Sequence, residues 1–228
     1  ILFQVLLSIA STFVYLASMA SMASSDELSA KTVSIGQAEV SYELQSDFGD
    51  LDEIAKRGVL RVLVTHSKTD FFIDQGRIRG IQAEYVEEFL RKLNKDRTDG
   101  SNAGESHRII PQFVPVAFDE LIPSLLAGKG DIAAAFLTMT PERKAEVDFV
   151  SPYGRLVDEI LVAHKNAEPI KKLSDLSGRT VYVLKGSSYA LHLSELNKSL
   201  SLLDLPAVKI VNADNQLLTE DILELVNA

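Results

Sequence analysis

Cysteine is absent from the 228 residues of this chain. Its absence excludes disulfides, thiolate metal sites, a cysteine nucleophile and a lipid attached through a cysteine side chain. Histidine is scarce: the four histidines never lie four residues apart or in a short cluster, so the sequence holds no zinc-binding motif. We therefore expect no metal site and no cofactor.

Basic residues are also in short supply. The chain has 23 Lys and Arg against 32 Asp and Glu, which gives a net charge of −9 at pH 7. This charge disfavours nucleic acid or an anionic membrane surface as the main partner. The length allows one or two domains with a buried core. We expect a globular protein that recognises a small molecule or another protein, and no nucleic acid.

Charged residues are missing from the start of the chain, where the first is Asp26. In the segment 1–23, 17 of 23 residues are apolar, and the segment ends in alanines and serines. Its densest part, residues 5–16, has the length of a signal-peptide hydrophobic region, although no basic residue precedes it. About 20 apolar residues could also span a bilayer. We predict that residues 1–23 are a signal peptide or membrane anchor, and that the rest is periplasmic or associated with the outer membrane.

Predicted strands and helices alternate from residue 51 onward, after a polar segment, residues 24–50, that is typical of a linker. The predicted helices are 51–58, 83–93, 118–127, 189–197 and 217–226. The predicted strands are 59–64, 109–116, 131–136, 180–184 and 208–211, with an extended segment at 157–163, a turn at 76–80 and a surface loop at 94–108. The alternation predicts an α/β fold with a parallel or mixed sheet covered by helices.

The most informative segment follows the predicted strand 131–136. Thr138 and Thr140 come just after the strand, Pro141 suits a first helical turn with Thr140 as its N-cap, and Arg143 takes the third helical position. Open α/β sheets bind ligands at the carboxyl ends of their strands. A guanidinium group matches a carboxylate with two hydrogen bonds. The alternative is that Arg143 only forms a surface ion pair with a glutamate of its own helix.

Several motifs resemble the amino-acid-binding class of periplasmic solute-binding proteins. In lobe 1 of that class they are a helix–Gly-Lys-Gly-Asp turn, here ending at Asp131, the loop Leu-Thr-Met-Thr-Pro-Glu-Arg at 137–143, and Asp-Phe-Val-Ser-Pro-Tyr at 148–153. At the opening of lobe 2 they are Asp-Leu-Ser-Gly-Arg at 175–179 and Lys-Gly-Ser-Ser-Tyr at 185–189. The combination is specific and extends from about residue 51 to the end of the chain.

The resemblance implies the type II fold of periplasmic binding proteins, in which two lobes close over a ligand. Lobe 1 would span residues 51–156 and lobe 2 residues 157–228. Lobe 2 has only two clear strands, which do not form a stable sheet alone. We therefore expect lobe 2 to be incomplete and the return segment to lobe 1 to be truncated.

A closer resemblance is to the N-terminal sensor domain of the F-type membrane-bound lytic murein transglycosylases. It rests on Leu-Asp-Glu-Ile at 51–54 followed by Gly-Val-Leu-Arg-Val-Leu, on Phe71-Phe72, on the Gly-Ser-Ser-Tyr turn and on the helix at 219–226. In that family a catalytic domain with its glutamate follows the sensor domain. We identify no catalytic residue in these 228 residues, so the chain is not assigned an enzymatic activity.

The resemblance also implies roles for individual residues. Arg143 would grip an α-carboxylate, Thr138 would add a hydroxyl and an amide, and Ser188 would add an amide from lobe 2. The expected ligand-binding residues are Arg143, Thr138, Ser187, Ser188, Phe118, Phe71 and Phe72. The phenylalanines would form apolar walls, although Phe71 and Phe72 could equally belong to the core. Phe136, where amino-acid binders often have a small polar residue, suggests a bulkier or more apolar ligand.

Three functions remain open. The first is a sensor domain that captures a small carboxylate-bearing ligand, an amino acid or a peptidoglycan-derived peptide, as the regulatory half of a lytic murein transglycosylase. The second is a freestanding amino-acid-binding subunit of an ABC importer, whose partner is a membrane permease. The third is a dehydratase on the same scaffold, for which the sequence places no catalytic acid. The reading frame after residue 228 would discriminate among them.

Overall fold

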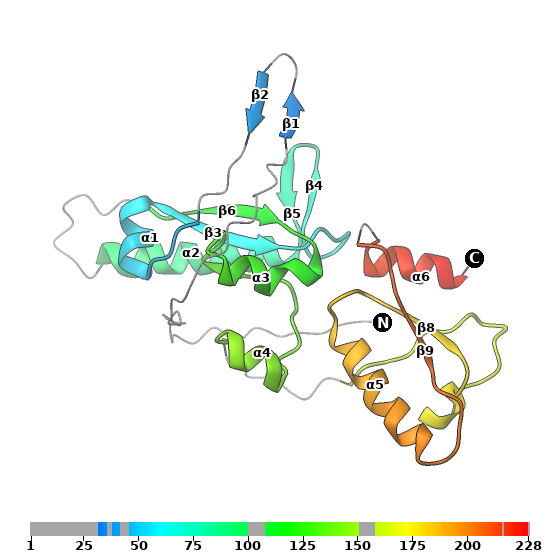
Figure 1. Ribbon diagram of the computed structural model, residues 1–228. Coiled ribbons are helices and arrows are strands. Elements are labelled where there is room, and N and C mark those ends of the chain that lie inside the picture. Colours follow the sequence, from blue (N-terminus) through cyan, green and yellow to red (C-terminus); the bar gives the residue numbers. More distant parts are fainter. Residues whose placement is uncertain are drawn as a thin grey trace.

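The computed structural model describes residues 32–35, 38–41, 46–99, 108–150, 158–215 and 217–227 (Figure 1). We call the described residues 46–150 lobe 1 and those from 158 to 227 lobe 2. The predicted signal peptide or anchor, residues 1–23, lies outside the described residues, as does the predicted lobe boundary near residue 156. Within the described part of the chain, no helix combines the length and apolarity needed to cross a membrane.

A three-stranded parallel sheet forms the centre of lobe 1. Its strand order is β6-β3-β7, with β3 at Val59–Val64, β6 at Ile110–Pro115 and β7 at Ile132–Ala133. Five of the six residues of the central strand β3 are buried. Its nearly continuous apolar sequence is what a parallel strand needs when both faces are covered.

Helices cover both faces of this sheet (Figure 1). The helices of lobe 1 are α1 (Leu51–Arg57), α2 (Ile81–Asp99), the 3-10 helix η1 (Phe118–Glu120), α3 (Leu121–Leu126) and α4 (Pro141–Glu146). Because side chains alternate along a strand, Leu60, Val62 and Val64 of β3 pack in one apolar cluster with α1 and α2. Leu63 points the other way and packs in a second cluster with α3.

The predicted helices and strands of lobe 1 are found at the predicted positions, but some differ in length. Helix α1 begins after its N-cap Asp50 and ends at Gly58, whose φ of 72° lies in the left-handed region. Helix α2 continues to Asp99, so the predicted surface loop begins later than residue 94; charged residues on an outer helix face do not end a helix. Strand β7 has only two residues, shorter than the predicted strand 131–136.

Two hairpins were not predicted. Strands β4 (Phe72–Asp74) and β5 (Arg77–Arg79) pair in antiparallel fashion, so the predicted turn at 76–80 contains a strand. Strands β1 (Thr32–Ile35) and β2 (Ala38–Ser41) form a second hairpin within the segment predicted as a linker. Three- and four-residue strands give too short an apolar pattern to be recognised from sequence.

Lobe 2 contains a two-stranded parallel sheet of β8 (Thr180–Val183) and β9 (Lys209–Asn212). The core beside it is formed by Leu176, Leu200 and Val208. The helices of lobe 2 are the 3-10 helix η2 (Leu173–Leu176), α5 (Ser188–Ser201) and α6 (Thr219–Asn227). Residues 158–163, part of the segment predicted to be extended, form no strand.

Each lobe uses one asparagine to join a helix to the strand that follows. In lobe 1 the Asn94 side chain donates to the carbonyl of Ile109 at 2.8 Å and accepts from its amide at 2.9 Å. In lobe 2 the Asn197 side chain makes the same two bonds with Val208, at 3.0 and 2.7 Å. Both amides therefore satisfy backbone groups at the entry to a strand.

A buried ion pair explains the one charged residue in β3. The guanidinium of Arg61 donates to Asp131 Oδ1 at 2.7 Å, and the Arg61 amide donates to Oδ2 at 2.7 Å. Arg57 donates to the same Oδ2 at 2.7 Å. The side chain of Asp131 is 3% exposed and that of Arg61 is 8% exposed. Since Arg61 also donates to the carbonyls of Gly128 and Asp47, it ties the α3–β7 turn and the entry to α1 to the central strand.

Candidate functional site

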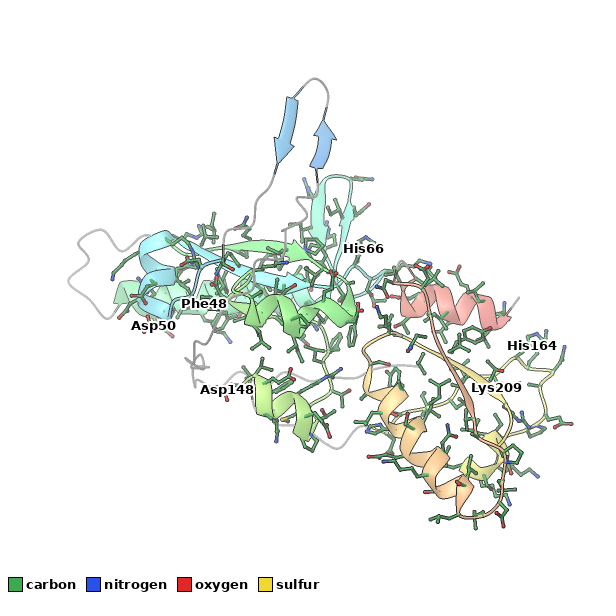
Figure 2. All side chains as sticks on the ribbon, in the orientation of Figure 1. Phe48, Asp50, His66, Asp148, His164 and Lys209 are labelled. Carbon is green, nitrogen blue, oxygen red and sulfur yellow. The ribbon has the colours of Figure 1, made fainter. Side chains whose placement is uncertain are left out.

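A cavity of about 1010 Å³ lies where the two lobes meet. Its walls come from the residues that follow β3, β6 and β7 in lobe 1 and β8 and β9 in lobe 2, so the carboxyl ends of all five parallel strands open toward it. His66, labelled in Figure 2, lies in the loop after β3, on the side where α6 approaches lobe 1. This is the position where α/β sheets bind ligands.

The segment after β7 adopts the local structure that the sequence predicted. Thr140 is the N-cap of α4, and its hydroxyl accepts a hydrogen bond of 3.3 Å from the Arg143 amide. Pro141 occupies the first helical position, where a missing amide proton has no consequence. This capped turn fixes the direction in which Arg143 leaves the helix.

The Arg143 guanidinium lies at the wall of the cavity, between the lobes. It donates to the carbonyl of Thr138 in lobe 1 at 2.6 Å and to the carbonyl of Gly186 in lobe 2 at 2.7 Å. Burial lowers the pKa of Arg143, and an arginine remains protonated at neutral pH even so. Among the described residues no carboxylate forms an ion pair with Arg143, so the alternative of a surface pair within α4 is wrong.

Lobe 2 presents the N-terminus of α5 to the cavity. Ser187 is the N-cap residue, and its buried hydroxyl oxygen has no hydrogen-bond partner among the described residues. The Ser188 hydroxyl donates to Glu159 at 3.1 Å. Burial, reinforced by the charge of Glu159, raises the pKa of Tyr189 to about 12, so this phenol is neutral. Because the first amides of an α-helix have no partner within the helix, the N-terminus of α5 at this wall favours an anionic group.

Of the phenylalanines predicted to form apolar walls, only some line the cavity. Phe118 and Phe136 line the cavity. Phe136 has a φ of 34°, a conformation that non-glycine residues rarely adopt and that often accompanies a binding site. Phe71 and Phe72 do not line it: Phe71 is 2% exposed in the core, with its ring 5.2 Å from that of Phe113, and Phe72 belongs to the β4–β5 hairpin. The core alternative for Phe71 is therefore correct, because this side chain faces α2 rather than the strand ends.

The sequence alone does not indicate the acidic side chains that line the cavity. Asp70, Glu120, Glu220 and Asp221 line it together with Arg143. The Ser67 hydroxyl donates to Glu220 at 2.8 Å, which links the loop after β3 to the start of α6. The signal that could have found Glu220 is the Thr-Glu-Asp start of the predicted last helix, but sequence does not show which loop it faces. Within the described residues, no group of three or more potential ligands is arranged for a metal ion.

The surroundings of Asp70 predict that the stability of the protein depends on pH. Burial raises the pKa of Asp70, and the nearby charge of Glu220 raises it further, while hydroxyl hydrogen bonds from Thr69 and Ser67 oppose the shift. The folded state then holds this proton more tightly than the unfolded state, so the Asp70 contribution to stability falls as pH rises from its ordinary pKa to the raised one. We expect Asp70→Asn to gain stability relative to the parent over that interval, measured by urea unfolding at several pH values. A difference that stays constant or changes in the opposite sense would contradict this.

Comparisons with known sequences agree with this geometry. A family model described as bacterial extracellular solute-binding proteins, family 3, matches residues 60–227. The membrane-bound lytic murein transglycosylase F of Pseudomonas putida is 29% identical over 153 residues, which cover 65% of this chain and 28% of that protein. The L-cystine-binding protein TcyJ of Escherichia coli is 27% identical over 154 residues, covering 67% and 53% respectively. The chain thus spans from about a quarter to about half of the length of these relatives.

Solved structures give the fold. The ancestral amino acid-binding protein AncCDT-1, described as a precursor of cyclohexadienyl dehydratase, is 33% identical with a TM-score of 0.59, and the match covers 77% of this chain and 69% of that one. The holo form of ArgBP from T. maritima is 29% identical with a TM-score of 0.57, covering 77% and 68%. The chain therefore has the two-lobed α/β fold of periplasmic amino-acid-binding proteins, as the sequence predicted.

Proposed function

The chain belongs to family 3 of the bacterial extracellular solute-binding proteins, and we propose that its lobes close on a small ligand that carries a carboxylate. The resemblance to the amino-acid-binding class is confirmed, and so is that to the solute-binding region of murein transglycosylase F. The ligand would be an amino acid or a peptide derived from peptidoglycan. Membership of a family of extracellular solute-binding proteins supports a periplasmic location for the two lobes.

The observation that carries the proposal is the position of Arg143. A guanidinium has five N–H donors, and two protein carbonyls account for two of them here. The Arg143 side chain lines the cavity, as do Ser187 and Ser188 at the start of α5 in lobe 2. A carboxylate held by these groups would contact both lobes. Binding would therefore favour the arrangement in which the lobes meet.

The relatives support two forms of this function. We propose that this chain is the regulatory half of a lytic murein transglycosylase. The reason is that the resemblance to transglycosylase F includes the segment around α1 as well as the two lobes. The second candidate is the amino-acid-binding subunit of an ABC importer, which the match to an L-cystine-binding protein favours. The dehydratase alternative requires a catalytic acid in the cavity; Asp70, Glu120 and Glu220 line it, and we propose no catalytic role for any of them.

A binding screen tests the proposal. The purified protein, after a check that it unfolds cooperatively, would be titrated by calorimetry with each of the common L-amino acids and with peptidoglycan tripeptides and tetrapeptides. Each ligand that binds would be compared with its decarboxylated amine. We expect binding that is lost with the amine. Equal binding of the amine, or no binding in the panel, would contradict the proposal; a preference for peptides favours the sensor, and a preference for free amino acids favours the carrier.

A further inference from the structure

The two lobes touch directly beside the cavity, through the turn between β8 and α5. Lys185 Nζ lies 2.9 Å from Asp119 Oδ2, so the turn of lobe 2 is paired with η1 of lobe 1. Hydrogen bonding to Asp119, with its negative charge, raises the pKa of Lys185. The Asp119 side chain is 20% exposed and that of Lys185 is 49% exposed. This pair joins the lobes without any ligand group between them.

The neighbouring residue, Gly186, permits the close approach. Its φ is +77°, and a Cβ placed on it would lie 2.7 Å from Asp119 Cβ and 2.8 Å from Asp119 Cα. The Cα is backbone and cannot rotate away, so a larger residue would have to push lobe 2 from η1. The Gly186 carbonyl also accepts the bond from Arg143 at 2.7 Å. One turn therefore brings together an interlobe ion pair, a close backbone approach and a contact with the candidate carboxylate-binding group.

We propose that Asp119, Lys185 and Gly186 form a clasp that raises the fraction of molecules with closed lobes, beside the contacts that α6 makes with lobe 1 through Ser67 and Lys68. The inference rests on the proposed function in one respect: the clasp tunes affinity only if the cavity binds a ligand. The apparent affinity for a ligand is the intrinsic affinity multiplied by the fraction of molecules in the binding-competent state, which here is the state with closed lobes. These three are positioning residues, since they act on the lobes rather than on the ligand.

The clasp can be tested by a distance measurement that needs no ligand. Because the chain has no cysteine, spin labels can be attached specifically through Lys56→Cys in lobe 1 and Leu202→Cys in lobe 2, two exposed positions. We expect Gly186→Ala to shift the distance distribution toward longer values. Gly178→Ala is the matched control: its φ is +72°, but its added Cβ would meet only Pro206 Cβ, at 3.7 Å within lobe 2. The control should leave the distribution unchanged.

Charge-reversal variants test the clasp without the backbone strain that a substitution at Gly186 introduces. Lys185→Glu should also lengthen the distance, and the double variant with Asp119→Lys should restore it. If the screen supplies a ligand, loss of one exposed pair should weaken its binding by roughly twofold to fivefold, with part of the loss recovered in the double variant. Unchanged distances in both Gly186→Ala and Lys185→Glu would overturn the clasp. Failure to bind any ligand, with the distance shifts present, would contradict the proposed function alone.

Discussion

Replacing Arg143 with alanine is expected to weaken binding of the carboxylate ligand by about 2–5 kcal/mol. That corresponds to a loss of roughly 30-fold to several-thousand-fold in affinity. The reason is that the carboxylate would enter a cavity whose other charged lining groups, such as Asp70 and Glu220, are acidic. Calorimetry with the ligand identified in the screen measures the effect.

Two variants separate the role of Arg143 from general damage to α4. Arg143→Lys keeps the positive charge but loses the planar pair of donors, so we expect an intermediate loss. Lys144→Ala changes the adjacent exposed residue of the same helix and should bind normally. Unchanged affinity in Arg143→Ala would show that the carboxylate is held elsewhere.

Replacing Asp131 with alanine is expected to destabilise the protein by about 3–5 kcal/mol. The substitution removes the carboxylate that Arg57 and Arg61 share, and it leaves the Arg61 guanidinium in the centre of the sheet without its charged partner. Urea unfolding at low temperature gives the change in free energy. Asp131→Asn retains the size of the side chain but not its charge, so we expect it to lose stability as well.

An exposed ion pair provides the comparison. Glu168 lies 3.4 Å from Arg179, and its side chain is 91% exposed. Such pairs contribute little because water screens both charges, so Glu168→Ala should change the unfolding midpoint only slightly. Similar losses for Glu168→Ala and Asp131→Ala would contradict the buried network as a source of stability.

The parts of the site that follow from local sequence could be predicted. Thr140, Pro141 and Arg143 are neighbours in the chain, and a helix start has strong preferences at each of these positions. The continuous apolar run of β3 likewise identifies a strand covered on both sides. The placement of Arg143 at a strand end therefore follows from short-range rules.

The parts that depend on distant contacts could not be predicted. Asp131 and Arg61 are 70 residues apart, and nothing in either segment shows that they pair. Glu220 reaches Ser67 over 153 residues. Phe71 was ambiguous because an aromatic residue after a strand can face the core or a cleft, and only the path of the chain into the β4–β5 hairpin decides which.

The asparagine that joins helix to strand in each lobe is a point at which deamidation would affect both lobes in the same way. Deamidation of Asn94 or Asn197 would exchange an N–H donor for a charged oxygen that faces the carbonyl of Ile109 or Val208. The hydrogen bond from the backbone amide of Ile109 or Val208 to the side-chain oxygen would survive. The strand would therefore keep its register but lose one of its two hydrogen bonds to the helix. A deamidated protein should therefore loosen at the residue just before β6 or β9 before the sheets themselves separate.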